Sequence, residues 1–119
     1  MVDKSTILSD VKSTLDFASE EDSGFDERLI IEIDGIVGEL SQFTYINSSF
    51  EMTKESKWAQ LLKHDDPFSL RLAKQYVYIA ARIRFDPPTG SILTSLEKSL
   101  NNTAHRLIIQ KENFDELSD

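Results

Sequence analysis

The sequence contains no cysteine and only four glycines, which do not cluster. Without cysteine the chain can form neither a disulfide framework nor a thiolate metal site, and this composition suits a reducing compartment. The scattered glycines form no phosphate-binding loop, and no Gly-x-Ser-x-Gly motif indicates a nucleophile elbow. Several common classes of enzyme therefore have no support in the sequence.

A long apolar run and an excess of basic residues are also missing. No stretch is long enough to span a membrane, and the first residues contain no signal-peptide core. The formal net charge is −8, so the composition differs from that of a basic nucleic-acid-binding protein. An acidic surface repels phosphate, which suits a protein past which DNA must move without adhering.

Metal-ligating side chains other than carboxylates are few. His64 and Asp65 resemble paired ligands of metal phosphohydrolases, but His105 is the only other histidine, which favours a surface histidine near a helix start. The three adjacent carboxylates at 20–22 are interpreted as a solvated charge run, because no spaced partner supplies further ligands. No carboxylate pair lies in an apolar setting that would raise a pKa. We expect no catalytic residue, no cofactor and no metal site.

The stretch 69–90 organises the rest of the chain. Apolar residues recur three and four apart from Leu72 to Ile83, which predicts a helix that is apolar nearly all round and enclosed by other elements. Asp86 precedes two prolines, and each proline removes a backbone donor, so this helix ends there. Thr89 or Ser91 can cap a new helix beyond the corner.

Periodicity and capping signals predict one all-α domain over residues 1–119. The predicted elements are helices at 4–17, 25–43, 67–85 and 91–113, a helical turn at 57–62, an irregular loop at 44–56 and a flexible acidic tail at 114–119. The stripe of the second helix is Leu29, Ile33, Ile36, Val37 and Leu40. Gly35 and Gly38 lie on nearly one face of that helix. They are either simply tolerated or mark a site where another backbone packs closely.

Three further features allow two interpretations each. Trp58 is a core anchor by default and an interface anchor otherwise. Loop 44–56 is a plain loop or, less favoured, an extended segment that pairs with another chain. Four basic residues lie on the third helix and either form salt bridges within this acidic chain or contact an acidic partner or DNA. These residues are Arg71, Lys74, Arg82 and Arg84.

The segment 78–114 carries a more specific pattern. A helix ends in Phe-Asp-Pro-Pro, a short Thr/Ser cap follows, and an amphipathic helix then contains Leu-Glu-Lys and a later Arg-Leu. The residues are Phe85, Asp86, Pro87, Pro88, Thr89, Leu96, Glu97, Lys98, Arg106 and Leu107. This pattern resembles the C-terminal half of phage head–tail connector proteins, the head-completion adaptors of tailed double-stranded DNA phages. Ala104-His105 stands where family members often have an aromatic residue.

The resemblance implies a structural adaptor rather than an enzyme. Such proteins form a ring of about twelve copies between the portal vertex and the tail, and they extend the DNA channel after packaging. The implied partners are the portal protein, a tail or stopper protein and further copies of the chain. DNA would pass through without specific binding, and no membrane is involved. The implied location is the head–tail interface of the virion, and the host cytoplasm during assembly.

Three groups of residues are expected to act in this role. The structural corner is Phe85, Asp86, Pro87 and Pro88, where Asp86 is expected to accept backbone hydrogen bonds or pair with an arginine. The portal-docking residues are Leu107, Ile108, Ile109 and Phe114, unless this helix end folds back on its own core. The subunit contacts are Tyr45, Ile46, Phe50, Arg82 and Arg84. The first alternative function is a small acidic regulatory module or DNA mimic. The second and less favoured alternative is a metal hydrolase built on His64 and Asp65.

Overall fold

The computed structural model describes residues 6–15 and 24–117, and the contacts given below are among these residues. They form α1 (Ile7–Thr14), α2 (Asp26–Leu40), the 3-10 helix η1 (Trp58–Gln60), α3 (Pro67–Phe85) and α4 (Ser91–Leu117). No strand forms in this part of the chain, and its only β-type pairing is an isolated bridge between Ile46 and Leu62. The prediction of an all-α fold is confirmed.

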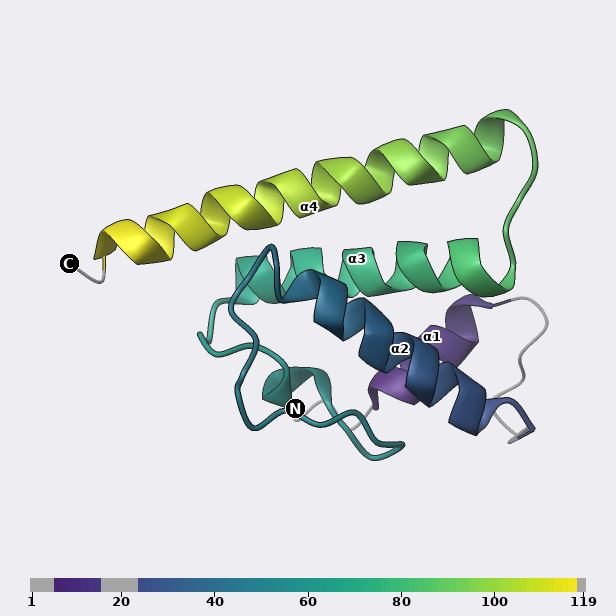
Figure 1. Cartoon of the computed structure of the whole chain (residues 1–119), viewed down its shortest axis with the longest axis horizontal. Coiled ribbons are helices and arrows are strands. Elements are labelled where there is room, and N and C mark those ends of the chain that lie inside the picture. Colours follow the sequence, from purple (N-terminus) through teal and green to yellow (C-terminus); the bar gives the residue numbers. More distant parts are fainter. Residues whose placement is uncertain (1–5, 16–23, 118–119) are drawn as a thin grey trace.

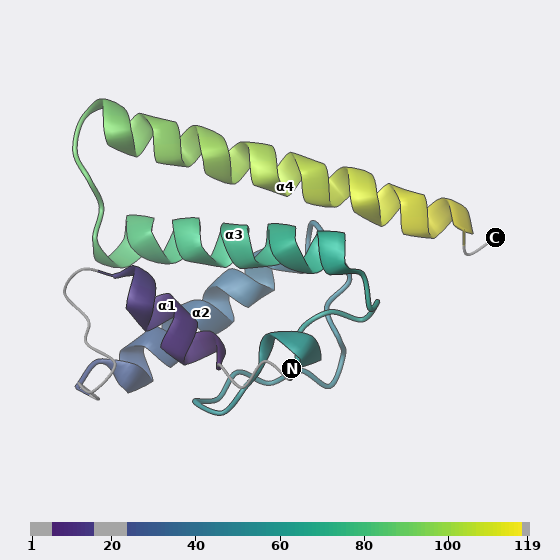
Figure 2. The same cartoon turned by 180° about the vertical axis from the view of Figure 1, so that it is seen from behind.

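Helix α3 lies between the other helices. Helix α4 runs antiparallel along one side of α3, and α1 and α2 pack on its other side (Figure 1). Seen from behind, α1 lies in front of α2, so α2 covers the face of Figure 1 and α1 the opposite face (Figure 2). Because α3 contacts all three other α-helices, the prediction of an enclosed helix in this stretch is confirmed.

The core is built from the predicted stripes. All five stripe residues of α2 are buried, and α3 adds Leu72, Ala73, Tyr76, Val77, Ala80 and Ala81. Trp58 is 3% exposed, and its Nε1–H donates a hydrogen bond of 2.8 Å to Asp10 Oδ2 in α1. The edge of the indole meets the ring of Tyr78 at a centroid distance of 5.7 Å. Trp58 is therefore a core anchor, as the default interpretation has it.

The first two helices are shorter than predicted. Thr6 caps α1 by accepting a hydrogen bond of 3.1 Å from the Ser9 amide, so the helix starts at Ile7. It gives way to extended backbone at Leu15. Helix α2 ends at Leu40 rather than residue 43, because the amides of Gln42 and Phe43 tighten into turns by bonding to carbonyls three residues back.

The two glycines of α2 meet no other backbone. A Cβ at Gly35 would have only the Arg84 guanidinium as a neighbour, at 3.6 Å, and one at Gly38 would meet nothing within 4 Å. Within the single chain they are tolerated glycines, and the face that carries them stays open.

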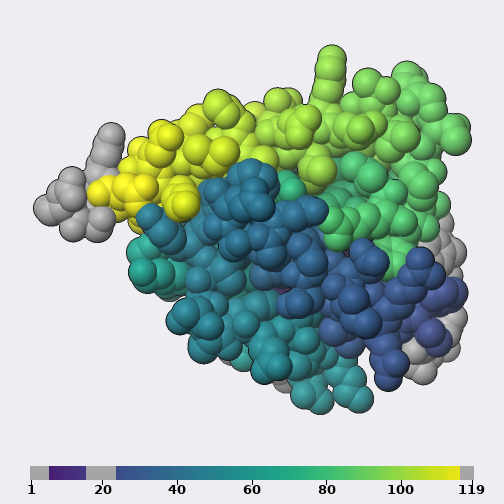
Figure 3. Space-filling model, in the orientation of Figure 1, coloured from purple at the N-terminus to yellow at the C-terminus, as the bar shows by residue number. Residues whose placement is uncertain are grey.

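Helix α4 is longer than predicted, since it continues from Ser91 to Leu117 and does not end at Asn113. The Asn113 side chain donates a 3.0 Å hydrogen bond to the Gln110 side chain one turn earlier and does not interrupt the helix. The prediction of a flexible tail from residue 114 is therefore wrong for residues 114–117. The last turns of α4 extend beyond the rest of the bundle (Figures 1 and 3).

Candidate interaction surfaces

The corner between α3 and α4 starts from a packed aromatic residue. Phe85 ends α3 and packs against the core, and the guanidinium of Arg28 lies 5.7 Å from the centre of its ring. The Asp86 amide donates a 2.8 Å hydrogen bond to the Arg82 carbonyl, which closes the last turn. In the described part of the chain, the Asp86 carboxylate has no hydrogen bond and no ion pair. The expectation of a partner is therefore wrong: Arg84 pairs with Glu32 and Glu39 of α2 instead.

Glycine completes the corner. Gly90 has φ +65°, a left-handed conformation that side chains disfavour, and no other described residue has a positive φ. Its carbonyl accepts from the Thr94 amide at 3.4 Å. Neither Thr89 nor Ser91 makes a capping hydrogen bond among the described residues, because Ser91 is already the first helical residue. The chain thus turns through Pro87, Pro88 and Gly90 into α4, whose first turn has no capping hydrogen bond from Thr89 or Ser91 within the described part of the chain.

The basic residues of α3 divide into two groups. Arg84 pairs with Glu32 at 3.4 Å and with Glu39, both on α2, as the salt-bridge interpretation predicts. Glu39 also accepts a 3.2 Å hydrogen bond from the Tyr76 hydroxyl. Burial, together with the charge of Glu39, raises the pKa of Tyr76 to about 12. Arg84 therefore joins α3 to α2 within the chain.

The other basic residues of α3 behave differently. Arg71 and Arg82 are exposed, and neither has an ion pair with a described residue. The ammonium of Lys74 lies 5.6 Å from the Trp58 ring centre, a cation–π contact rather than a salt bridge. For Arg71 and Arg82 the salt-bridge interpretation is wrong, and contact with an acidic partner stays a prediction.

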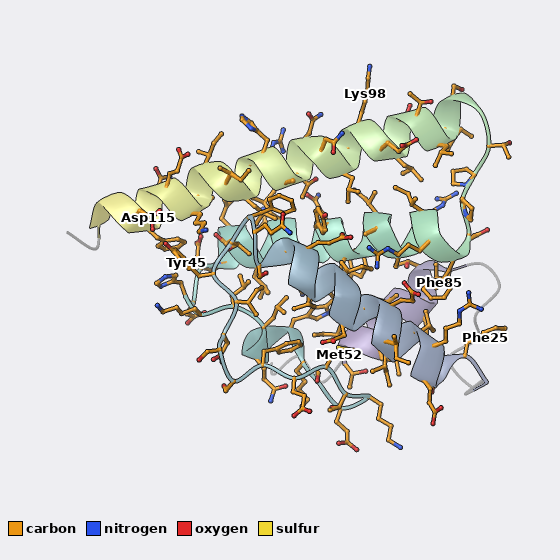
Figure 4. All side chains as sticks on the ribbon, in the orientation of Figure 1. Phe25, Tyr45, Met52, Phe85, Lys98 and Asp115 are labelled. Carbon is orange, nitrogen blue, oxygen red and sulfur yellow. The ribbon has the colours of Figure 1, made fainter. Side chains whose placement is uncertain are left out.

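The C-terminal end of α4 is attached to the loop segments by aromatic side chains. Phe114 stacks on His64, whose ring edge in turn meets Tyr45 at a centroid distance of 5.5 Å. The Tyr45 hydroxyl donates a hydrogen bond to Asp115, and the two side chains meet at the end of the helix (Figure 4). This bond is the main reason that the pKa of Tyr45 is raised, followed by burial and by the Asp115 charge.

The predicted portal-docking residues lie in different environments. Leu107 is 0% exposed and belongs to the core, so it cannot present a surface to a partner. Ile108 is half-buried, Phe114 packs on His64, and Ile109 is 46% exposed. Of the four, Ile109 is the large apolar side chain that remains open to solvent. The docking role of this helix end stays a prediction that now centres on Ile109.

The loop at 44–56 is ordered within the single chain. Ile46 bridges to Leu62, Met52 is 7% exposed, and the Ser56 carbonyl accepts a 2.9 Å hydrogen bond from the Ile7 amide. Within the single chain this segment is an irregular loop, and its pairing with another chain stays a prediction. Tyr45, Ile46 and Phe50 are half-buried, and a role for them in subunit contacts stays a prediction.

The described part of the chain contains no cluster of side chains that could form a metal site. No three histidine, aspartate or glutamate side chains converge there to hold a metal ion. The carboxylates at 20–22 lie outside the described residues. Asp66, next to His64 and Asp65, caps α3 through hydrogen bonds to the Phe68 and Ser69 amides. No described helix has the length and apolar character to cross a membrane.

Comparison with known proteins agrees with the resemblance seen in the sequence. Neither curated proteins nor solved structures give a significant match. The sequence profile described as phage connector protein matches residues 7–114, a range that begins with α1 and reaches the last turns of α4. Because this range includes most of the chain, the protein belongs to the phage connector protein family, a family of structural virion proteins.

Proposed function

We propose that the protein is a head–tail adaptor that forms a ring between the portal vertex and the tail and extends the DNA channel after packaging. The single observation that carries this proposal is the family match over residues 7–114, because it includes all four α-helices rather than one motif. The proposed partners are the portal protein on one side and a tail or stopper protein on the other, with about twelve copies in the ring.

The distribution of exposed apolar side chains supports assembly into a ring. Large apolar residues are exposed on three different helices: Ile31 of α2, Phe68 of α3, and Ile92 and Ile109 of α4. A cyclic assembly needs two different complementary surfaces on every subunit, whereas a twofold dimer needs only one. The net charge of −8 also suits a channel that DNA must cross without adhering.

The portal-docking surface that we propose is the outward side of the C-terminal third of α4, centred on Ile109. Ile109 is 46% exposed and begins the last third of α4 (Ser91–Leu117). Truncation after Arg106 would be a poor test of this surface, because it removes the fully buried Leu107 together with the exposed residues. A single exposed side chain gives a cleaner experiment.

The test is co-sedimentation of the full-length protein with isolated portals of the same phage. The unaltered protein is expected to sediment with the portals, and Ile109→Asp to bind at least roughly ten-fold more weakly, since an apolar contact becomes a buried charge. Ser95→Asp, at an exposed position toward the other end of α4, is the control for the added charge and is expected to bind normally. Equal binding of all three proteins would move the docking surface elsewhere. Failure of the unaltered protein to bind portals would contradict the adaptor function itself.

A further inference from the structure

The charges of this acidic chain are strongly segregated. Residues 1–66 carry fifteen acidic and six basic side chains, whereas residues 67–111 carry seven basic and two acidic ones. The second segment contains α3 and α4 as far as Lys111, before the acidic end of α4 with Glu112, Asp115 and Glu116, and the first contains α1, α2 and the loops. The basic side is therefore the α3–α4 hairpin as far as Lys111, although the whole protein has a net charge of −8.

The basic side contains a groove between α3 and α4 of about 430 Å³. Gln75 and Tyr78 line it from α3, and Asn102 and Arg106 from α4, with no carboxylate among the lining residues. Arg71 lies one turn before Gln75, and Arg82 lies one turn after Tyr78, so arginines flank the groove along α3. Arg71, Arg82 and Arg106 are all exposed and have no ion pair with a described residue.

The acidic side contains an open helix face. Glu27, Ile31 and Asp34 of α2 are four and three residues apart, so they form one stripe along the helix. Ile31 is 69% exposed, more than any other large apolar side chain described. Glu27 and Asp34 are exposed and have no ion pair among the described residues. Nothing lies within 4 Å of a Cβ at Gly38, so a partner can approach the helix backbone closely on the same face.

These two surfaces lie on opposite sides of the molecule. Tyr76 of α3 points to α2, since its hydroxyl donates to Glu39. Tyr78, two residues later, points to the α1 side, where it meets Trp58 and through it Asp10. Because Tyr78 lines the groove, the groove lies on the side of α3 that faces away from Glu39 of α2. The stripe of α2 lies on the side of that helix opposite its buried residues, such as Leu29 and Ile33.

We infer that the α2 stripe of one copy docks into the α3–α4 groove of the next copy, with Ile31 inserted between the two helices. This inference rests on the proposed ring and names its subunit interface. The carboxylates of Glu27 and Asp34 are about 10 Å apart along the helix axis, and the flanking arginines about 16 Å apart, a difference that long arginine side chains can span. Because the stripe is acidic and the groove is flanked by arginines, another copy of this chain is the partner that complements the groove.

The geometry of this contact explains why it would repeat. A copy whose stripe is occupied still has a free groove on its opposite side, so each addition leaves an acceptor for the next copy. Such head-to-tail contacts close into a ring when a whole number of the rotations from one copy to the next adds up to a full turn. No copy would then keep an unpaired stripe or groove.

Cross-linking tests the interface directly, because the chain has no cysteine of its own. The full chain with Ile31→Cys and Gln75→Cys is assembled on isolated portals and treated with a short bis-maleimide. A ladder of covalent oligomers is expected. The matched control carries Ile31→Cys and Lys98→Cys, since Lys98 points away from the rest of the molecule (Figure 4), and is expected to give at least roughly ten-fold less product. Equal cross-linking of both proteins, or none in the first while a ring is present, would overturn the interface.

Charge exchange provides a second readout that an altered fold would not reproduce. Glu27→Arg with Asp34→Arg is expected to weaken ring assembly by roughly ten-fold or more, as is Arg71→Glu with Arg82→Glu, because like charges then face each other. All four changes in one chain restore opposite charges and are expected to restore the ring. Lack of restoration in a folded protein would overturn the interface. Absence of any ring or portal binding with the unaltered chain would instead contradict the proposed function.

Discussion

The ring of Phe114 stacks on the imidazole of His64, with centroids 4.4 Å apart and 14° between the ring planes. This contact attaches the last turns of α4 to the segment just before α3. The hydrogen bond from Tyr45 to Asp115 and the ammonium of Lys111, 5.0 Å from the Tyr45 ring centre, act at the same place. The end of α4 is thus held to the bundle by aromatic and polar contacts, although it extends beyond the core.

Replacing Phe114 with alanine is expected to loosen this attachment. The change removes an aromatic pair and a half-buried side chain, so the free energy of unfolding should fall by about 1 kcal/mol. Hydrogen exchange of the backbone amides at 113–117 should become faster while that of α3 stays slow. Ile109→Ala, at an exposed position of the same helix, is the control and should change stability by less than about 0.5 kcal/mol. Unchanged exchange at 113–117 would mean that the stacking does not hold the helix end.

How far the sequence predicts this structure depends on whether the signal is local. The stripe from Leu29 to Leu40 follows the helical period, and its burial is confirmed. The end of α4 is not predicted, because the contacts that hold residues 114 and 115 come from Tyr45 and His64, far away in the sequence. Leu107 is part of the apolar stripe, and periodicity alone predicts its burial. In the single chain Leu107 is 0% exposed and belongs to the core.

Other features could not be predicted because they depend on the packing of separate helices. Lys12 lies on α1, and nothing nearby in the sequence shows that it is 3% exposed. Its Nζ lies 2.8 Å from Asp26 Oδ1 at the start of α2. The opposed acidic and basic surfaces also follow only from the arrangement in space, since the sequence indicates that α3 is basic but not which of its arginines are paired.

Removing the carboxylate of Asp26 is expected to destabilise the protein more than removing the lysine. Asp26→Ala removes the carboxylate that lies 2.8 Å from the buried ammonium of Lys12 and should lower the free energy of unfolding by about 2 kcal/mol. Lys12→Met removes the charge and keeps much of the volume, so its cost should stay below about 1 kcal/mol. Urea denaturation of both variants measures the difference. A larger loss for Lys12→Met than for Asp26→Ala would contradict the buried-charge argument.

The corner is expected to be stiffened by its prolines. Pro87→Gly gives the unfolded chain more conformations and should lower the free energy of unfolding by about 1 kcal/mol. The variant should also allow the angle between α3 and α4 to vary, which reduces ring assembly on portals. Thermal unfolding and assembly yield are the measurements, with Ser95→Gly, an exposed position within α4, as a control for a glycine away from the corner. An unchanged melting temperature together with normal assembly would exclude a structural role for Pro87.

The capping carboxylate of Asp66 is expected to make the stability of the protein depend on acid pH. Its pKa is lowered, first by the hydrogen bond from the Ser69 hydroxyl and then by those from the Ser69 and Phe68 amides and from Gln110, against an opposing effect of burial. A lowered pKa in the folded state means that the stabilisation is complete above the unfolded-state value of 3.8 and is lost as pH falls through the folded value. Asp66→Ala should therefore cost about 1 kcal/mol at pH 7, the usual value of an N-cap.

Replacing Asp66 with asparagine separates the contribution of the capping hydrogen bonds from that of the negative charge. Asp66→Asn keeps an oxygen that accepts from the Phe68 and Ser69 amides, so at pH 7 this variant should be nearly as stable as the original protein. As pH falls below 3.8 and through the lowered pKa of the folded state, the original protein should lose more stability than the asparagine variant, because only the carboxylate at position 66 takes up a proton. Urea unfolding at a series of pH values measures both curves. Parallel curves would mean that the charge of Asp66 contributes nothing, and a large loss for asparagine at pH 7 would mean that Asp66 acts other than as a helix cap.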